Sequence, residues 1–176
     1  MKLKIPYLLA ATVAIGSLFY FADTPGLGAA QLVTVKSVAG HELDLAKPDG
    51  KTRLVSFYAP NCPISNRDVQ PFSNLQAQFA TDEFEVVAIA MPYAEIQEVA
   101  SHAELENIEY SIAHDADGTI GSAFPGVRFT PTTFLIDSAG EIVWRKVGAI
   151  NTTETAGLIT ELLQPNQLAT NSHQAK

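Results

Sequence analysis

Residues 53–65 read Arg-Leu-Val-Ser-Phe-Tyr-Ala-Pro-Asn-Cys-Pro-Ile-Ser, and this stretch decides the fold class. Residues 53–58 form a short β-branched and aromatic run that is typical of a buried central strand. Cys62, the one cysteine of the chain, follows at the junction with a predicted helix. A helix N-terminus stabilises thiolate, the nucleophilic form of cysteine. Cys62 is therefore the candidate reactive group, and the alternative is a small buried hydrophobic residue.

Strand and helix patterns alternate on both sides of this stretch. Strands are predicted at residues 32–38, 42–45, 53–58, 85–91, 110–114, 132–137 and 141–147. Helices are predicted at 64–79, with a kink at Pro71, at 95–102 or slightly beyond, at 119–124 and at 152–163, where Asn151 or Thr152 is the N-cap. The first two strands form a hairpin, and the order implies a three-layer α/β domain with a mixed sheet and helices on both faces.

The N-terminal residues predict a membrane-targeting segment. Lys2 and Lys4 precede an apolar run at residues 5–22, whose length fits either a signal peptide or a short membrane anchor. Cleavage after Ala30 and retention in the inner membrane both remain open, and either places the folded domain in the periplasm or another extracytoplasmic space. We therefore expect residues 1–30 to be a signal peptide or anchor with a linker, 31–164 to be the domain, and 165–176 to be a disordered tail.

Charge and composition exclude several classes of function. The net charge of −8 argues against a nucleic-acid partner, which requires clustered positive charge. The four histidines lie on different predicted elements without paired ligand spacing, so neither a metal nor a cofactor is predicted. A single exported cysteine cannot form an intramolecular disulfide, and it therefore suggests intermolecular pairing or a reactive thiol.

Two segments resemble thioredoxin-like thiol-disulfide oxidoreductases of the exported TlpA/ResA type, within a resemblance that spans roughly residues 32–163. Residues 57–65 resemble the strand-Cys-Pro-helix segment of that family. Residues 128–137, Arg-Phe-Thr-Pro-Thr-Thr-Phe-Leu-Ile-Asp, resemble its cis-proline segment, and residues 139–143 with Gly148 match its closing hairpin. The resemblance implies a thioredoxin-like three-layer sandwich with an N-terminal β-hairpin extension. It also implies that Pro131 is cis and faces the sulfur, that the Thr130 backbone is free to bind an extended substrate, and that Pro63 and Asn61 contact that substrate.

The sequence departs from the family pattern at the second sulfur. The usual Cys-x-x-Cys is Cys62-Pro63-Ile64-Ser65 here, and Asn61 replaces the aromatic residue before the first cysteine. A hydroxyl cannot resolve a mixed disulfide at neutral pH, so an external thiol has to do so. Ser65 is expected either to donate a hydrogen bond to the thiolate or to be an ordinary first-turn serine.

Three functions remain open from the sequence. The main hypothesis is thiol-disulfide exchange on exported proteins, in which a monomer uses Cys62 and is released by glutathione, a partner reductase or the substrate's own second thiol. The first alternative is a non-enzymatic thioredoxin-like binding or assembly module. The second is a one-Cys peroxiredoxin-like peroxidase, although the threonine of the peroxiredoxin motif is replaced by Ala59.

Overall fold

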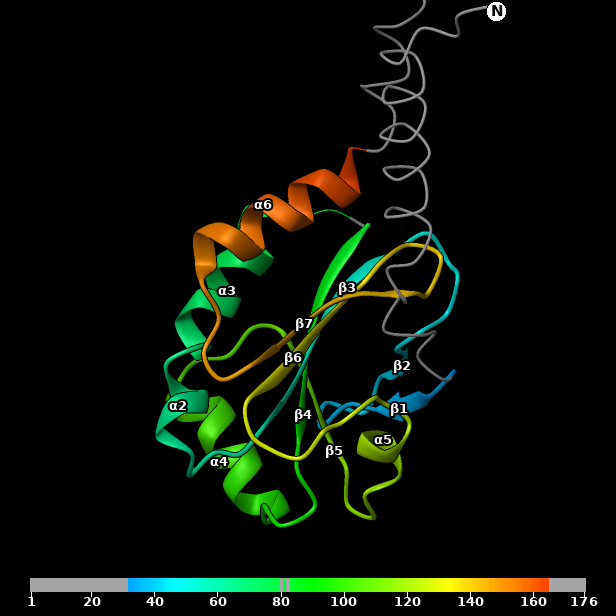
Figure 1. The fold of residues 1–176 in the computed structure, drawn as a ribbon. Helices are drawn as coiled ribbons and strands as arrows, with labels where there is room; N and C mark the ends of the chain where they lie inside the picture. The colour runs from blue at the N-terminus through cyan, green and yellow to red at the C-terminus, as the bar shows by residue number, and fades with distance from the viewer. Residues whose placement is uncertain (1–31, 80, 82, 165–176) are drawn as a thin grey trace, which may run out of the picture.

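The computed structural model describes residues 32–79, 81 and 83–164, in which helices and strands form three layers (Figure 1). Its elements, in chain order, are β1 (Thr34–Lys36), β2 (Glu42–Asp44), β3 (Thr52–Tyr58), α2 (Pro63–Asn66), α3 (Val69–Gln78), β4 (Phe84–Ala90), α4 (Ile96–Leu105), β5 (Ser111–His114), α5 (Thr119–Ser122), β6 (Thr132–Ile136), β7 (Ile142–Val147) and α6 (Thr152–Leu163). The predicted α/β class and the N-terminal hairpin are confirmed, although β1 and β2 are shorter than the alternating pattern suggested.

The central sheet is mixed and has the strand order β5-β4-β3-β6-β7. β3 pairs parallel with β4 and antiparallel with β6, and all seven of its residues are buried. β1 and β2 form a separate two-stranded antiparallel sheet, joined to the main sheet by a bridge between Ser37 and Ala113. The segment that carries Cys62 therefore follows β3, the middle strand of the sheet. This strand is packed against other elements on both of its faces.

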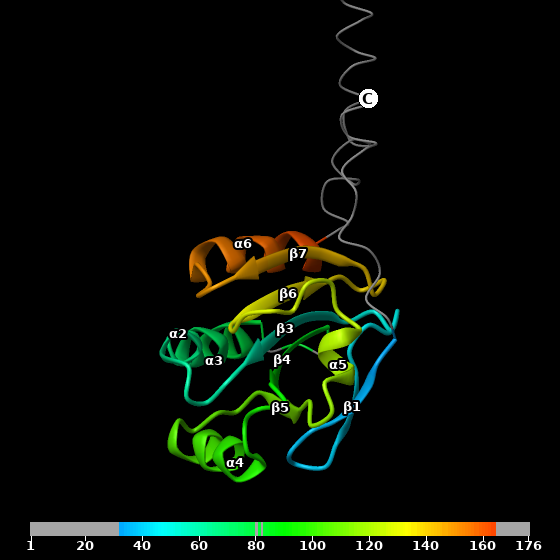
Figure 2. The same cartoon turned by 60° about the horizontal axis from the view of Figure 1, so that its bottom comes forward.

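The two faces of the sheet bury different apolar clusters. Alternate residues of β3 point to opposite faces, so Val55 and Phe57 pack with the hairpin and α5, whereas Leu54 and Tyr58 pack against α3, α4 and α6. Figure 2 shows α2, α3, α4 and α6 on one side of the sheet, and α5 with β1 on the other. Helices lie on both faces of the sheet, as predicted. On the second face the described residues form one short helix, α5, and the β1–β2 hairpin covers the rest of that face.

The predicted kinked helix at residues 64–79 is wrong, because the chain forms two helices that are separated at Arg67 and Asp68. Pro71 lies in the first turn of α3, where its missing N–H has no intrahelical partner to lose. Its ring would clash with the carbonyl of Arg67 in one continuous helix, so the chain breaks before the proline and not at it. The break buries Asp68 behind the first helix.

The predictions for the two ends of the chain lie outside the described residues. These are the membrane-targeting segment at residues 1–30 and the tail at 165–176. Within the part of the chain that the structure describes, no helix has both the length and the apolar character needed to cross a membrane.

Candidate functional site

Cys62 lies where the chain leaves the carboxyl end of β3 and enters α2. A turn closes between the two elements, because the Cys62 amide donates to the Ala59 carbonyl at 3.0 Å. Cys62 is then the N-cap of α2, with Pro63 in the first helical position. The cysteine is half-buried, whereas Asn61 and Pro63 beside it are exposed. The predicted junction is thus present, and the sulfur remains open to solvent on the side of these two residues.

The segment at Thr130 and Pro131 faces the sulfur, 68 residues further along the chain. The Thr130–Pro131 peptide bond is cis, as the family resemblance implied. The Cys62 thiol donates to the Thr130 carbonyl, with 3.6 Å between sulfur and oxygen. This hydrogen bond uses one of the two lone pairs of the Thr130 carbonyl while Cys62 is a thiol. Because a thiolate has no proton to donate, ionisation releases this carbonyl as an acceptor.

The surroundings of Cys62 favour its ionised form. Burial raises the pKa of the thiol, but hydrogen bonds to the sulfur outweigh this effect and hold the pKa below its ordinary value. The donors that favour the thiolate are the hydroxyl and amide of Ser65, the Thr130 hydroxyl and the Ile64 amide. Two of these donors are amides of the first turn of α2, which agrees with the helix-terminus argument made from the sequence.

Ser65 is buried on the inner side of α2, where the second cysteine of a Cys-x-x-Cys motif would stand. Its hydroxyl has no hydrogen-bond partner among the described residues while Cys62 is a thiol. A buried hydroxyl without a partner is costly, and a neighbouring thiolate would satisfy it. The position therefore favours the predicted hydrogen bond to the thiolate over an ordinary solvated serine.

Asp68 is a residue of the site that the sequence prediction missed. It is 2% exposed, and its carboxylate accepts from the Ile150 amide at 3.1 and 3.3 Å. Its own amide donates to the Ser65 carbonyl at 3.0 Å, and Gly148, just before Ile150 in the same loop, donates to the Pro131 carbonyl at 2.8 Å. Burial raises the pKa of Asp68 to about 6, although the Ile150 amide and the Arg67 charge oppose the shift. Asp68 thus ties the helix that carries Cys62 to the loop that contacts Pro131.

Exposed apolar side chains surround the opening at Cys62. Ile64 is 46%, Tyr93 62% and Phe129 69% exposed. The Tyr93 hydroxyl lies 3.3 Å from the Thr130 hydroxyl, so the tyrosine belongs to the same surface as the cis-proline segment. Such a rim suits a partner that brings a flexible apolar segment next to the sulfur. Tyr93 was not among the predicted site residues, because its loop after β4 carries no pattern that connects it to Cys62.

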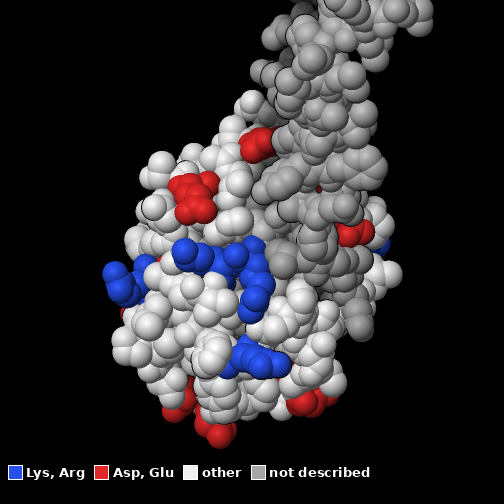
Figure 3. Space-filling model, in the orientation of Figure 1, with Lys and Arg blue, Asp and Glu red and all other residues white. Residues whose placement is uncertain are grey.

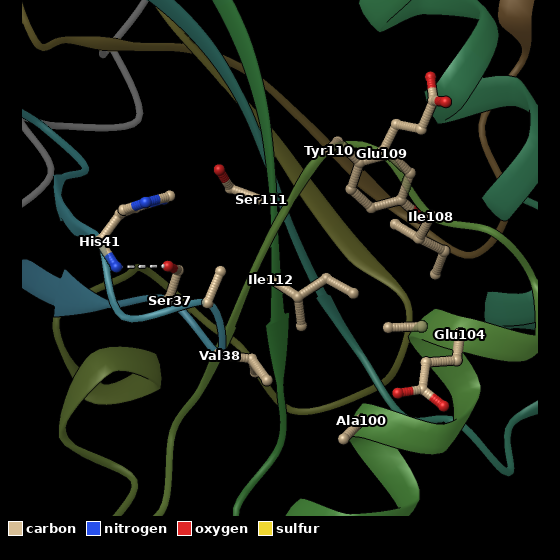
Figure 4. A pocket seen from close by; sticks show the side chains of 12 residues that line it. Ser37, Val38, His41, Ala100, Glu104, Ile108, Glu109, Tyr110, Ser111 and Ile112 are labelled. Atoms are coloured by element: carbon tan, nitrogen blue, oxygen red, sulfur yellow. Dashed lines mark hydrogen bonds between the residues drawn. The ribbon is translucent and has the colours of Figure 1, made fainter.

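A second hollow lies away from the cysteine. A cavity of about 410 Å³ opens between α4, β5 and the turn after β1, with Val38, Ile112 and Glu104 among its lining residues (Figure 4). His41 is one of its lining residues, whereas the half-buried His102 lies at a tilt against Tyr58, with 5.8 Å between ring centroids. No group of three His, Cys, Asp or Glu side chains in the described ranges could hold a metal ion.

Comparisons with known proteins agree with this geometry. A model of the Redoxin family matches residues 28–162. Thiol-disulfide oxidoreductase ResA of Halalkalibacterium halodurans is 25% identical over 93% of this chain and 94% of that protein. The soluble secreted antigen MPT53 of Mycobacterium tuberculosis is 26% identical over 88% of this chain and 90% of that protein. The structure of a thiol:disulfide interchange protein from Chlorobium tepidum shares the fold, with a TM-score of 0.70, 23% identity and coverage of 80% of this chain and 99% of that chain. With its thioredoxin-like fold and its family match over most of its length, the chain belongs to the Redoxin family.

Proposed function

We propose that this protein carries out thiol-disulfide exchange through Cys62 alone, and that an external thiol completes each cycle. The observation that carries the proposal is a half-buried thiol of lowered pKa that faces Thr130 and Pro131, with a hydroxyl at Ser65 where a second sulfur would stand. The likeness to ResA, whose name is thiol-disulfide oxidoreductase, supports the same chemistry.

The exchange consists of two displacements at sulfur. The Cys62 thiolate attacks one sulfur of a substrate disulfide, which forms a mixed disulfide and expels the other substrate sulfur as a thiolate. A second thiolate then attacks the substrate sulfur of this mixed disulfide and returns Cys62 as a thiolate. That thiolate comes from glutathione, from a partner reductase or from the substrate itself, because Ser65 has no sulfur to offer. Each displacement breaks one S–S bond and forms another, so no further oxidant is required.

The cis-proline segment suits the binding of an extended substrate. Once Cys62 ionises, the Thr130 carbonyl loses its thiol donor and can accept from a substrate amide instead. Asn61 and Pro63 are exposed beside the sulfur and would contact the same segment. We assign these residues to substrate binding, whereas Cys62 is the nucleophile and Ser65 stabilises its thiolate.

We further propose that the domain works as a monomer outside the cytoplasm. The apolar residues 5–22 fit export or anchoring in the inner membrane, and the relative MPT53 is described as secreted. Disulfide-bonded substrates are available in such a compartment, where an unpaired thiol meets them.

The test is the pH dependence of Cys62 alkylation by iodoacetamide in the full-length protein, together with reaction with an oxidised protein substrate. We expect a thiol pKa below the reference of about 8.5, and a mixed disulfide that accumulates until glutathione is added. Ser65→Cys is the comparison variant, and it should release the substrate without an added thiol. Cys62→Ser is the control for labelling at any other group.

Other outcomes would support the alternative functions. If Cys62 in the folded chain reacts only above the reference pKa, the protein is better described as a binding or assembly module without turnover. If hydrogen peroxide oxidises Cys62 to a sulfenic acid much faster than Cys62 reacts with any disulfide, the peroxidase hypothesis is supported. The residue three positions before Cys62 argues against the second outcome, because Ala59 is apolar and cannot orient a peroxide.

A further inference from the structure

The basic residues of this acidic chain are unevenly distributed over its surface. Of the eleven lysines and arginines, eight lie in the described ranges once Lys2, Lys4 and Lys176 are set aside. Four of these eight belong to the elements around the Cys62 opening, and they are Arg67, Arg128, Arg145 and Lys146. Figure 3 shows lysine and arginine atoms from the left edge across the middle of one face, with most of the aspartate and glutamate atoms above and below them. We call these four residues the basic surface.

The topology connects three members of the basic surface to the cis-proline segment. Arg128 is exposed and precedes Thr130, the contact of the Cys62 sulfur, by two residues. Lys146 is exposed on β7 and pairs in register with Thr133, two residues after Pro131. Arg145 donates to the Gly126 carbonyl at 2.6 Å, which fixes its guanidinium beside the loop that leads to Arg128.

The fourth member, Arg67, completes the surface on the side of the nucleophile. It is the exposed C-cap residue of α2, the helix that begins at Cys62. The described part of the chain holds three ion pairs, Lys47–Asp44, Arg53–Asp49 and Arg53–Glu85, and none includes a member of the basic surface. Arg145 is half-buried, with its guanidinium over the Phe134 ring, and the charge of Arg67 acts on the buried Asp68. Arg128 and Lys146 are therefore the exposed charges of this surface that remain available to a partner.

We propose that the basic surface selects disulfide and thiol partners that carry carboxylates next to their sulfurs. The inference rests on the proposed exchange at Cys62 and names the class of substrate for it. Positive charge beside the sulfur attracts anionic partners during approach and repels cationic ones, although the chain as a whole is acidic. Because the groups are exposed, salt should screen the effect, since the Debye length is only about 8 Å at physiological ionic strength.

The selection acts on the partner and not on the thiol. Hydrogen bonds from Ser65, Thr130 and Ile64 hold the pKa of Cys62 down, so removing a charge from Arg128 or Lys146 should leave thiol reactivity toward a neutral reagent unchanged. This separates a recruiting role for the basic surface from an activating one.

The experiment measures the second-order rate constants of Cys62 with three disulfides of similar size, 3,3′-dithiodipropionate (charge −2), 2-hydroxyethyl disulfide (neutral) and cystamine (charge +2). Each rate constant is divided by that of 2-mercaptoethanol with the same disulfide, which removes differences in leaving group. We expect the normalised ratio of the anionic to the cationic disulfide to be roughly tenfold at 20 mM salt and to approach one at 0.5 M. Oxidised glutathione is a fourth probe, and a rate beyond that of dithiodipropionate would identify the tripeptide itself as the preferred anion.

The variant that tests the basic surface is the double substitution Arg128→Gln and Lys146→Gln in the full-length chain. It should lose most of the preference for the anionic disulfide and keep its rate with the neutral one. The matched control, Lys47→Gln with Lys51→Gln, removes two charges before β3, at the end of that strand opposite to Cys62, and should keep the preference. An equal ratio in the protein and in the Arg128/Lys146 variant overturns the inference and leaves the exchange function standing. Failure of Cys62 to react with even the neutral disulfide overturns the exchange function, and this inference with it.

Discussion

Asp68→Asn tests the role of the buried carboxylate behind the reactive helix. Asp68 is 2% exposed and its pKa is raised to about 6 by burial, from the 3.8 of an unburied aspartate. Because the folded protein holds this proton more tightly than the unfolded chain, its stability rises as the pH falls through 6 toward 4. The asparagine variant has no such proton, so it should lose this part of the pH dependence.

The magnitude follows from the shift in the pKa of Asp68. The rise in the pKa of Asp68 from 3.8 to about 6 means that ionised Asp68 destabilises the fold by about 3 kcal/mol at pH 8, of which about 2 kcal/mol is relieved by pH 4.5. Asparagine can still accept from the Ile150 amide, but it loses about 1 kcal/mol from the weaker hydrogen bond and about 1 kcal/mol from its unpaired buried amide. We expect Asp68→Asn to stabilise the protein by about 1 kcal/mol at pH 8 and to destabilise it by about 1 kcal/mol at pH 4.5.

The assay is urea unfolding at pH 8, 6 and 4.5, followed by the fluorescence of Trp144, the one tryptophan of the chain. Glu98→Gln is the control, because it removes one exposed carboxylate from α4 and leaves Asp68 in place. The reasoning is refuted if Asp68→Asn keeps the pH dependence of the original protein, or if it is less stable than that protein at pH 8.

Two further substitutions probe the first turn of α2 and the start of α6. Ser65→Ala should raise the pKa of the Cys62 thiol and slow its alkylation by iodoacetamide at pH 7 roughly fivefold, the factor for a lost hydrogen bond of about 1 kcal/mol. Ser65→Thr keeps the hydroxyl and should recover the rate. Equal rates in all three proteins would exclude a role for the hydroxyl. Asn151→Ala should lower the free energy of unfolding in urea by about 1 kcal/mol, because the Asn151 side chain caps α6 by accepting from the Glu154 amide at 3.1 Å. Asn151→Asp should retain that stability. An unchanged urea midpoint in the alanine variant would contradict the role of Asn151 as the cap.

The elements that local sequence specifies were predicted best. The apolar run at residues 53–58 corresponds to β3, which begins one residue earlier, at Thr52. The last helix, at 152–163, was correct at both ends, because Asn151 is a strong N-cap residue and Pro165 cannot continue the helix. The position of Cys62 at the end of the central strand followed from the local pattern, whereas the cis bond at Pro131 and its place opposite the sulfur were predicted from the resemblance to a known family, because nothing in the pattern of either segment connects the two.

The break between α2 and α3 shows a limit of pattern reading. A proline within a helical pattern indicates that the helix is interrupted, but the pattern does not say on which side of the proline the interruption falls. The structure places Pro71 inside the first turn of α3 and the break at Arg67 and Asp68. That choice buries Asp68, which its neighbours in sequence would have suggested to be a solvated helix residue.

The sequence by itself determined the α/β class, the central strand, the single sulfur at its end and the hydroxyl at Ser65, because each depends on residues that are adjacent or in one periodic segment. Only the tertiary structure decided which groups surround that sulfur. Thr130 is 68 residues from Cys62, and Ile150 is 82 residues from Asp68. Contacts over such separations arise from the order of strands in the sheet and from the packing of helices against it, and local sequence patterns encode neither.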